Sequence, residues 1–376
     1  MKKIGVFGGT FNPIHSEHIV IARLAIEKLN LDKLFIMPTF ISPHKKGNIA
    51  SAEDRFNMLK LAFKKDDKIE VSDFEIKNGG ESFTYITVEH FRSVYPDAQI
   101  FLICGADMLN DFKRWKYPER ILNACSLCAF GREDYQILEK EHKYFKKTFN
   151  KDFTLLNYKG KNVSSTRIRV YSALGLSVDG MTDDSVIEYI KNNNLYKGNK
   201  YFEYVKSVLP EKRLRHTAEV VIKASSKIRE LSLDSEKVYT ACVLHDIAKY
   251  QKIEDYPCFT LPKNVPEPVV HAFLGAYISE KVLGITDMEI IDAIKYHTSG
   301  KANMTTLGKL LFTADMVDET RNYEGVEKLR EYFSFSLEKG FIECLKEEML
   351  HLKNKNQPIY VETINAYNYY VKGEKE

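Results

Sequence analysis

Two histidines near the start of the chain stand where a strand-like run passes into a helical one. They are His15 and His18, and they follow the pair Gly8 and Gly9, which ends an apolar run that begins at Lys3. Glycine lets a ligand approach the backbone closely, and the free N–H groups of a helix N-terminus favour an anion. Residues three apart share a helix face, so both imidazoles can meet one phosphate group. The pattern indicates charge stabilisation at a reacting phosphoryl centre, although a short motif of this kind also arises by chance.

Four further segments with polar side chains follow, each at the end of a strand-like run or the start of a helical one. They are residues 38–46, 82–84, 103–107 and 163–169. The first and last carry lysine or arginine side chains that can neutralise phosphate, and the second and last place hydroxyl groups at a helix start. Trp115, the only tryptophan of the chain, follows the third. The recurrence of such segments favours a phosphate-binding function more strongly than any one of them.

The second half of the chain contains a different set, of histidines and aspartates on successive helical segments. The set consists of His216, His245, Asp246, His271, His297 and Asp315. Imidazole and carboxylate groups suit Fe, Mn and other transition ions, and helices can direct them into the core of a bundle. A single helical histidine is more often packed or solvated. However, Asp246 closes an apolar run that must be buried, and a buried carboxylate is costly without a metal or partner. Lys249 lies on the same helix face and could hold a phosphate oxygen.

The periodicity of the chain changes near residue 197. Strand-like and helical segments alternate up to that point, which predicts a parallel sheet with ligands at the carboxyl ends of its strands. From about residue 201 only helical periodicity is present, and the polar stretch 192–199 suits a linker. We therefore predict an α/β Rossmann-like domain at 1–197, with helices on both faces of its sheet, followed by an all-α domain at 200–376.

Composition supports two enclosed cores and excludes several classes of protein. A chain of 376 residues with 44% hydrophobic residues exceeds the usual size of one domain. The net charge of +3 is too small to indicate nucleic acid, and no apolar run reaches the length of a membrane span or an export signal. Cys125 and Cys128 lie in an apolar strand-like run, so we interpret them as core thiols. We expect a cytoplasmic protein, and its oligomeric state is left open.

The N-terminal motifs, taken in order over about residues 1–197, resemble the nucleotidyltransferase superfamily with HxGH and SSTxIR signatures. The resemblance is greatest to nicotinate-nucleotide adenylyltransferases. It implies that His15, His18, Lys45 and Arg169 contact the phosphates of ATP. The implied ATP-binding residues are Gly8, Gly9, Thr10, Phe11, Gly105, Asp107, Ser164, Ser165 and Thr166, and the implied nicotinate-binding residues are Thr84, Trp115 and Tyr117. The implied substrates are ATP, with Mg²⁺ on its triphosphate, and nicotinate mononucleotide.

Four residues depart from the pattern of this superfamily. Asn12 replaces a usual Asp, Glu17 the usual Gly of HxGH, Ser42 a usual Pro and Ile86 a usual Asp. None removes an implied phosphate ligand, but Ile86 leaves pyridine recognition open, and Glu17 adds a carboxylate near the phosphate site. Pantetheine-phosphate adenylyltransferases and cytidylyltransferases are the alternatives within the superfamily. Trp115 and the segment 82–84 argue against both.

The C-terminal pattern resembles the HD-domain family of symmetrical diadenosine tetraphosphate hydrolases over about residues 200–376. The segments 244–249, 296–300 and 313–315 carry the resemblance, while Ala272 and Phe273 depart from a usual Gly-Pro. Asp318 and Arg321 fall where that family keeps an acid and a base. The resemblance implies two transition-metal ions, iron or manganese, on the six residues of the His/Asp set, and Lys249 in catalysis. A cyclic-nucleotide phosphodiesterase, a nucleotidase and a nucleotide-sensing regulatory module are the alternatives.

Overall fold

The computed structural model describes residues 1–41, 49–131 and 135–373, and their side chains apart from those at 107, 110 and 135–138. Contacts divide the chain into two compact units. The first unit comprises residues 1–168 and 178–196, and the second comprises residues 169–177 and 197–376. Residues 169–177 thus pack within the second unit, although they precede residue 197 in the sequence. The ranges 1–197 and 200–376 remain a prediction about which stretches act independently.

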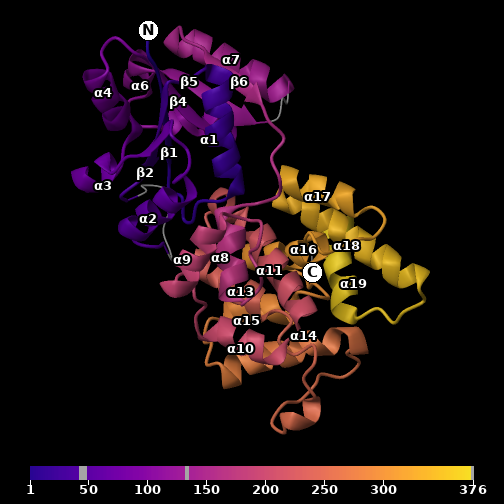
Figure 1. Cartoon of the computed structure of the whole chain (residues 1–376). Helices are drawn as coiled ribbons and strands as arrows, with labels where there is room; N and C mark the ends of the chain where they lie inside the picture. Colours follow the sequence, from indigo (N-terminus) through magenta and orange to yellow (C-terminus); the bar gives the residue numbers. More distant parts are fainter. Residues whose placement is uncertain (42–48, 132–134, 374–376) are drawn as a thin grey trace. The chain divides into compact units, whose positions relative to one another are not determined.

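The first unit is built on a six-stranded sheet in which every neighbouring pair is parallel. The strand order is β3-β2-β1-β4-β5-β6 (Figure 1). The strands are β1 (Lys3–Gly9), β2 (Lys33–Pro38), β3 (Ile69–Val71), β4 (Gln99–Gly105), β5 (Ser126–Gly131) and β6 (Phe153–Asn157). The order reverses between β1 and β4, so a crevice opens beyond the carboxyl ends of these two strands. The Rossmann-like prediction is confirmed.

Helices cover both faces of this sheet. They are α1 (Ser16–Leu29), α2 (Ala52–Ala62), α3 (Phe74–Asn78), α4 (Thr84–Val94), α5 (Asp107–Asp111), η1 (Phe112–Arg114), α6 (Pro118–Ala124), α7 (Tyr135–Phe149), α8 (Ser165–Ala173) and α9 (Asp184–Asn192). Alternate strand residues such as Ile4 and Val6 join a core with Val88 of α4 and Ile121 of α6. Phe7 points to the opposite face, where its ring meets that of His18 in α1. The period of two in the strands therefore separates the two layers of helices.

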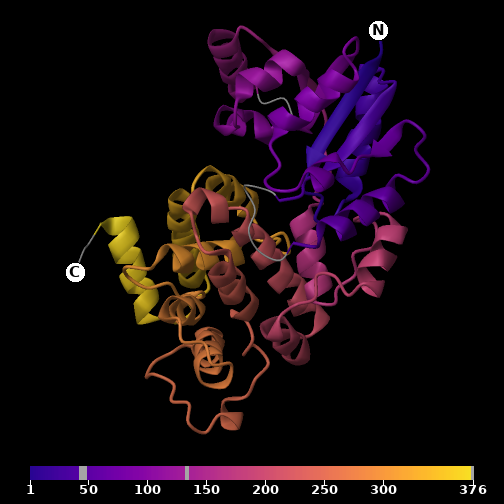
Figure 2. The ribbon, with the colours of Figure 1, turned by 90° about the vertical axis from the view of Figure 1, so that its left-hand side faces the viewer.

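Within the part that the structure describes, the second unit contains helices and no strand, as predicted, and most of it is the rose-to-yellow part of the chain in Figure 2. Its elements are α10 (Lys200–Val208), α11 (Glu211–Ser225), α12 (Ile228–Leu231), α13 (Ser235–Leu244), η2 (Ile253–Asp255), α14 (Glu267–Tyr277), η3 (Ile278–Val282), α15 (Met288–Tyr296), α16 (Thr306–Val317), α17 (Val326–Phe335), α18 (Leu337–Asn354), α19 (Val361–Tyr367) and η4 (Asn368–Lys372). Helix α15 packs against α13, α14 and α16, and α11 packs against α13 and α16. These five helices surround the His/Asp set.

Two cysteines of the first unit agree with the reading of the sequence. Cys125 and Cys128 are buried and free, and burial raises the pKa of both thiols to about 12. The interpretation of these residues as core thiols is confirmed. Among the described residues, every helix is too short or too polar to traverse a lipid bilayer.

Candidate functional site

The carboxyl ends of β1 and β4 form the edge at which the strand order reverses. Gly8 lies at the end of β1, and a Cβ atom placed there would meet no described atom within 4 Å. The backbone is therefore open to a ligand at this point. At Gly9 a Cβ atom would come within 3.0 Å of the Phe11 ring, so this glycine is needed for packing. Beyond β4, the N–H of Ala106 donates to the carbonyl of Phe130 at 2.9 Å, which fixes the second loop of the crevice.

His15 and His18 are brought together at the start of α1. His15 is the N-cap, and the rings of His15 and His18 stack with centroids 3.6 Å apart. The backbone N–H of His15 donates to Nδ1 of His18 at 3.3 Å. Because Nδ1 is an acceptor, the Nε2 atom of a neutral His18 carries the proton and can donate to an anion. The two imidazoles thus meet as predicted, although His15 caps α1 from an extended backbone conformation and does not lie on the helix face.

The start of α8 lies beside this pair. Ser164 accepts a hydrogen bond from the N–H of Arg167 at 3.1 Å and so caps the helix. The Ser165 hydroxyl donates to the carbonyl of Pro13 at 2.8 Å, which joins the two motifs directly. The N-terminal turn of α8 is therefore joined to the loop that carries the histidine pair.

The structure does not show three other implied ligands at this site. Arg169 lies further along α8, in the part of the helix that packs within the second unit. Lys45 lies outside the described residues, as does the departure at Ser42. Asp107 begins α5, and its side chain is not among those described. The roles of Arg169, Lys45 and Asp107 stay predictions.

The implied nicotinate residues lie next to an aromatic cluster that sequence reasoning only partly found. Thr84 begins α4, and the ring of Tyr85 meets that of Tyr117 edge to face, with centroids 5.0 Å apart. The guanidinium of Arg120 lies 4.5 Å from the Tyr85 ring centroid, and the Lys116 ammonium lies 4.2 Å from that of Phe83. Partly exposed aromatic rings flanked by cations suit a flat, anionic ligand. Repeated aromatic and basic residues in 83–85 and 115–120 were the available signal.

Trp115 takes a different part in the same region. It is half-buried, and its ring lies 5.2 Å from that of Phe112, in the core between the sheet and its helices. Part of this side chain is thus used for packing. Tyr117, by contrast, is 49% exposed. Of the two predicted ring-binding aromatics, Tyr117 is the one whose surface is more open.

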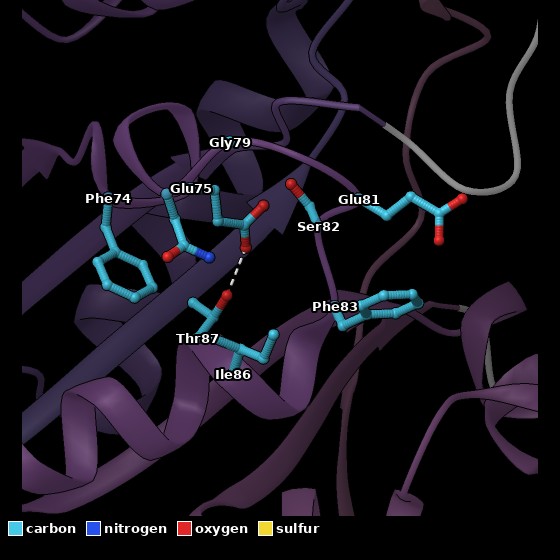
Figure 3. A pocket seen from close by; sticks show the side chains of 9 residues that line it. Phe74, Glu75, Gly79, Glu81, Ser82, Phe83, Ile86 and Thr87 are labelled. Atoms are coloured by element: carbon cyan, nitrogen blue, oxygen red, sulfur yellow. Dashed lines mark hydrogen bonds between the residues drawn. The ribbon is translucent and has the colours of Figure 1, made fainter.

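A small pocket lies beside the same segment and includes one of the departures from the superfamily. It holds about 10 Å³, enough for roughly one water molecule, and is lined by Ser82 and Ile86 among others. The Thr87 hydroxyl donates to the buried carboxyl of Glu75 at 2.5 Å across this pocket (Figure 3). Burial raises the pKa of Glu75. A carboxyl group is therefore present beside position 86, but it comes from α3.

Two buried polar residues hold the loops after β1 and β2: Arg55, which was missed from the sequence, and Asn12, which was noted there only as a departure. Arg55 of α2 is 2% exposed and donates to the carbonyl groups of Thr10, Phe40 and Ala50. Burial lowers its pKa. Asn12 accepts hydrogen bonds from the N–H of Ala50 and the hydroxyl of Tyr196. Because three chain segments depend on Arg55, it organises the loops that follow β1 and β2.

The predicted His/Asp residues of the second unit converge on one buried centre. They form three overlapping groups whose ligand atoms lie within 4.8 Å of one another: His216 with His245 and Asp246, Asp246 with His271 and His297, and His216 with Asp315 and Asp318. Asp246 belongs to two groups. Its Oδ1 lies 3.2 Å from Nε2 of His271, and its Oδ2 lies 3.7 Å from Nε2 of His245. A carboxylate shared in this way can bridge two ions.

Helix ends orient two of these imidazoles. His245 directly follows α13, and its Nδ1 donates to the carbonyl of Cys242 at 2.7 Å. His297 directly follows α15 and donates in the same way to the carbonyl of Ile294 at 2.7 Å. The tautomer that this requires leaves the Nε2 lone pair directed at the centre, as metal-ligating histidines need. Burial lowers the pKa of His297 to about 3, so the ligand is neutral at physiological pH.

Basic side chains surround the carboxylates of the centre. Arg213 donates to Oδ2 of Asp246 at 2.9 Å, and Arg321 donates to Oδ1 of Asp315 at 2.5 Å. Lys249 lies 3.3 Å from Nδ1 of His271, and burial lowers its pKa. Burial opposes ionisation of Asp246 and Asp315, yet the surrounding imidazoles hold the pKa of Asp246, and the Arg321 guanidinium with His216 that of Asp315, well below its usual value. The centre thus combines metal-ligand chemistry with cations for a phosphate.

Asp318 and Arg213 were not among the predicted ligands. Asp318 is fully buried, and its Oδ2 lies 3.3 Å from Nδ1 of His216, where a carboxylate orients a ligating imidazole. Its position three residues after Asp315 was a signal in the sequence. Arg213 stands three residues before His216 on α11, so its helical spacing was a signal too.

The sheet edge and the buried centre together define a class of protein: a nucleotidyltransferase unit joined to a metal-binding HD unit. The cytidylyltransferase-like family model matches residues 6–170, and the HD domain model matches residues 213–358. A probable nicotinate-nucleotide adenylyltransferase/Ap4A hydrolase of Mycoplasma genitalium is 30% identical over 328 residues, covering 86% of this chain and 89% of that protein. The chain belongs to this family of fused enzymes.

Two shorter proteins are similar to one half each. A probable nicotinate-nucleotide adenylyltransferase of Clostridium tetani is 37% identical over 200 residues, which cover 52% of this chain and all of that protein. The crystal structure of a predicted HD superfamily hydrolase involved in NAD metabolism from Clostridium acetobutylicum has 27% identity and a TM-score of 0.42, covering 46% of this chain and 97% of that one. The chain is an enzyme with a nucleotidyltransferase half and an HD-hydrolase half, and its HD half binds divalent metal.

Proposed function

We propose that the N-terminal unit transfers AMP from ATP to nicotinate mononucleotide, giving nicotinate adenine dinucleotide and pyrophosphate. The observation that carries this proposal is the meeting of the His15/His18 pair with the start of α8 at the β1/β4 switch point. The Mycoplasma and Clostridium relatives are named for this activity. The aromatic cluster at Tyr85 and Tyr117 supports a flat acceptor with a negative charge.

The reaction requires alignment rather than a protein nucleophile. The 5′-phosphate of the mononucleotide attacks the α-phosphorus of ATP in line with the departing pyrophosphate. His18 can donate through Nε2 to the oxygens that gain charge, and the N–H groups of α8 can hold the triphosphate. Mg²⁺ would neutralise the triphosphate and be held mainly by the nucleotide itself.

An acceptor panel tests this assignment. The full-length protein is incubated with ATP and, in turn, nicotinate mononucleotide, its amide form and phosphopantetheine, and pyrophosphate release is measured. We expect the highest kcat/KM with nicotinate mononucleotide. A preference for phosphopantetheine, or for CTP over ATP, would move the unit to another branch of the superfamily.

For the C-terminal unit we propose hydrolysis of diadenosine tetraphosphate to two ADP, with two iron or manganese ions. The carrying observation is that Asp246 is shared between two groups of ligands. The residues that would hold the ions are His216, His245, Asp246, His271, His297 and Asp315. Such ions activate water and polarise phosphoryl oxygens when bound. Lys249, Arg213 and Arg321 would neutralise the phosphate chain.

Metal analysis followed by product chromatography tests the second activity. The purified protein is analysed for iron and manganese, then supplied with diadenosine tetraphosphate, cyclic nucleotides and mononucleotides. We expect two ions per chain and ADP as the sole nucleotide product. ATP together with AMP would mean asymmetric cleavage. No turnover with any metal would favour the alternative, a nucleotide-sensing module. Against that alternative, a sensor does not need Lys249 beside a set of metal ligands. We place the enzyme in the cytoplasm, because both sets of proposed substrates are cytoplasmic metabolites.

A further inference from the structure

Glu17 stands between His15 and His18, at the position where the HxGH signature usually has glycine. It lies in the first turn of α1 and is 7% exposed. Its Oε2 atom accepts two hydrogen bonds, from the Tyr158 hydroxyl at 2.7 Å and from the backbone N–H of Lys161 at 2.9 Å. The donors are 141 and 144 residues away in the sequence. The carboxylate is therefore engaged by another segment of the same unit.

That segment leads directly to the second phosphate-binding motif. Residues 158–161 follow β6, and Ser164 begins the cap of α8 only three residues later. The N–H of Tyr158 also donates to the carbonyl of Gly131 at the end of β5, at 2.8 Å. One side of the segment is thus held by the sheet and the other by Glu17. We call the contacts of Glu17 with Tyr158 and Lys161 the Glu17 link.

The link is closely fitted. A Cβ atom at Gly160 would lie 2.5 Å from Oε2 of Glu17, so any side chain there would displace the carboxylate. Burial, reinforced by the bond to Glu17, raises the pKa of Tyr158 to about 12, so the phenol remains a donor at neutral pH. A carboxylate in the first turn of a helix is favoured by the positive end of the helix dipole. Bonds to an ionised acceptor are stronger than those between neutral groups, which suits a fixed geometry.

A second contact works beside the link. The Ser165 hydroxyl binds the carbonyl of Pro13, so the start of α8 is tied to the HxGH loop. The Glu17 link ties the segment before α8 to the helix that follows the same loop. Two attachments on either side of Ser164 fix both the position and the direction in which the N–H groups of α8 point.

We propose that Glu17 is a positioning residue for adenylyl transfer, holding residues 158–161 so that the start of α8 and the His15/His18 pair contact the triphosphate of the same ATP molecule. This rests on the proposed function of the N-terminal unit. Glu17 itself does not contact substrate. Its carboxylate, which from sequence would oppose a phosphate, is turned to Tyr158 and Lys161 instead.

The test measures ATP binding apart from acceptor binding. Full-length wild type, Glu17→Gly, Glu17→Gln and Tyr158→Phe are titrated with α,β-methylene-ATP and Mg²⁺ by calorimetry, and KM is measured for ATP and for nicotinate mononucleotide. Glu27→Gln is the control, since Glu27 lies on the same helix with its side chain 67% exposed. Any binding to the HD unit is common to all variants.

We expect Glu17→Gly to weaken analogue binding and raise the ATP KM by about 10-fold, because both attachments of segment 158–161 to α1 are lost. The KM for nicotinate mononucleotide should stay within about twofold. Glu17→Gln keeps one acceptor oxygen and Tyr158→Phe keeps the Lys161 bond, so their ATP KM values should lie between those of wild type and Glu17→Gly. These two variants also test the proposal if the glycine variant fails to fold. Folded variants with unchanged ATP affinity, or equal shifts in both KM values, would overturn the proposal. If wild type fails to use nicotinate mononucleotide but Glu17→Gly still loses analogue binding, the proposed acceptor substrate is wrong. The positioning role of Glu17 is then still supported.

Discussion

The two sites place their charges in opposite ways. At the sheet edge of the first unit, the protein offers backbone N–H groups, stacked imidazoles and exposed aromatic rings, and the carboxylate of Glu17 is already paired. In the second unit, imidazoles and carboxylates such as His245 and Asp246 are buried against one another. Under the proposed functions, a nucleotide would bring its own metal to the first site, whereas the second would hold its ions itself. Catalysis by alignment would then coexist in one chain with catalysis that depends on a bound ion.

The largest effect should come from removing the shared carboxylate. Asp246→Ala leaves two of the three groups of ligands incomplete, so we expect loss of bound metal and of hydrolysis to below detection, while adenylyl transfer is unchanged. Metal content and both activities are measured on one preparation. Asp255→Ala, at an exposed position of η2, is the control and should retain metal. A parallel loss of adenylyl transfer would show that the two sites are not independent.

A smaller effect is expected at the first site from His18→Ala. His18 should bind most strongly as charge develops at the α-phosphorus, so kcat should fall by about 10²-fold to 10³-fold with little change in KM. Steady-state kinetics with ATP and nicotinate mononucleotide measure kcat and KM. His142→Ala on α7, where the side chain is 40% exposed, is the matched control. A rise in KM alone would assign His18 to ground-state binding.

The aromatic cluster should act on one substrate only. Tyr117→Ala removes an exposed ring that meets Tyr85, and we expect the KM for nicotinate mononucleotide to rise about 10-fold with the ATP KM unchanged. Tyr250→Ala, at a 59% exposed position, is the control. An equal effect on both substrates would mean that the ring stabilises the fold of the crevice instead.

The smallest effect concerns the pH dependence of the second unit. Burial, with the nearby charge of Asp315, raises the pKa of Glu348 to about 7. The folded protein keeps this proton up to about pH 7, while the unfolded chain loses it near the ordinary glutamate value. The contribution of the protonated Glu348 to the free energy of unfolding is therefore complete below the ordinary glutamate pKa. It is lost as the pH rises through about 7.

Glu348→Gln removes this titration. In EDTA, we expect the variant to unfold about 3 °C above wild type at pH 8 and together with it at pH 5. Thermal unfolding monitored by circular dichroism gives both values, with Glu267→Gln at an exposed position as the control. A stabilisation that is the same at both pH values would contradict the pKa argument.

Much of both folds could be read from local patterns. Helix α1 begins at the His15/His18 pair and α4 begins at Thr84, as the sequence predicted. Helices α18 and α19 lie within the predicted all-α domain, but their individual positions were not predicted, although α18 buries Phe341 and Leu345. Beyond the last ligand, the sequence offered no motif that drew attention to them.

The sequence by itself determined which residues carry chemistry, because the HxGH and HD patterns depend on residue type and near-neighbour spacing. Near-neighbour spacing placed His15 beside His18 at the start of α1, whereas Asp246 and Lys249 lie in the turns that follow α13, so the helix face predicted for Lys249 is wrong. Tertiary structure alone decided that Glu17 meets Tyr158, that Arg55 joins the loops after β1 and β2, and that Asp246 is shared by two groups of ligands. These contacts join residues far apart in the chain, so no local period encodes them. They follow from which strands and helices become neighbours when the two cores form.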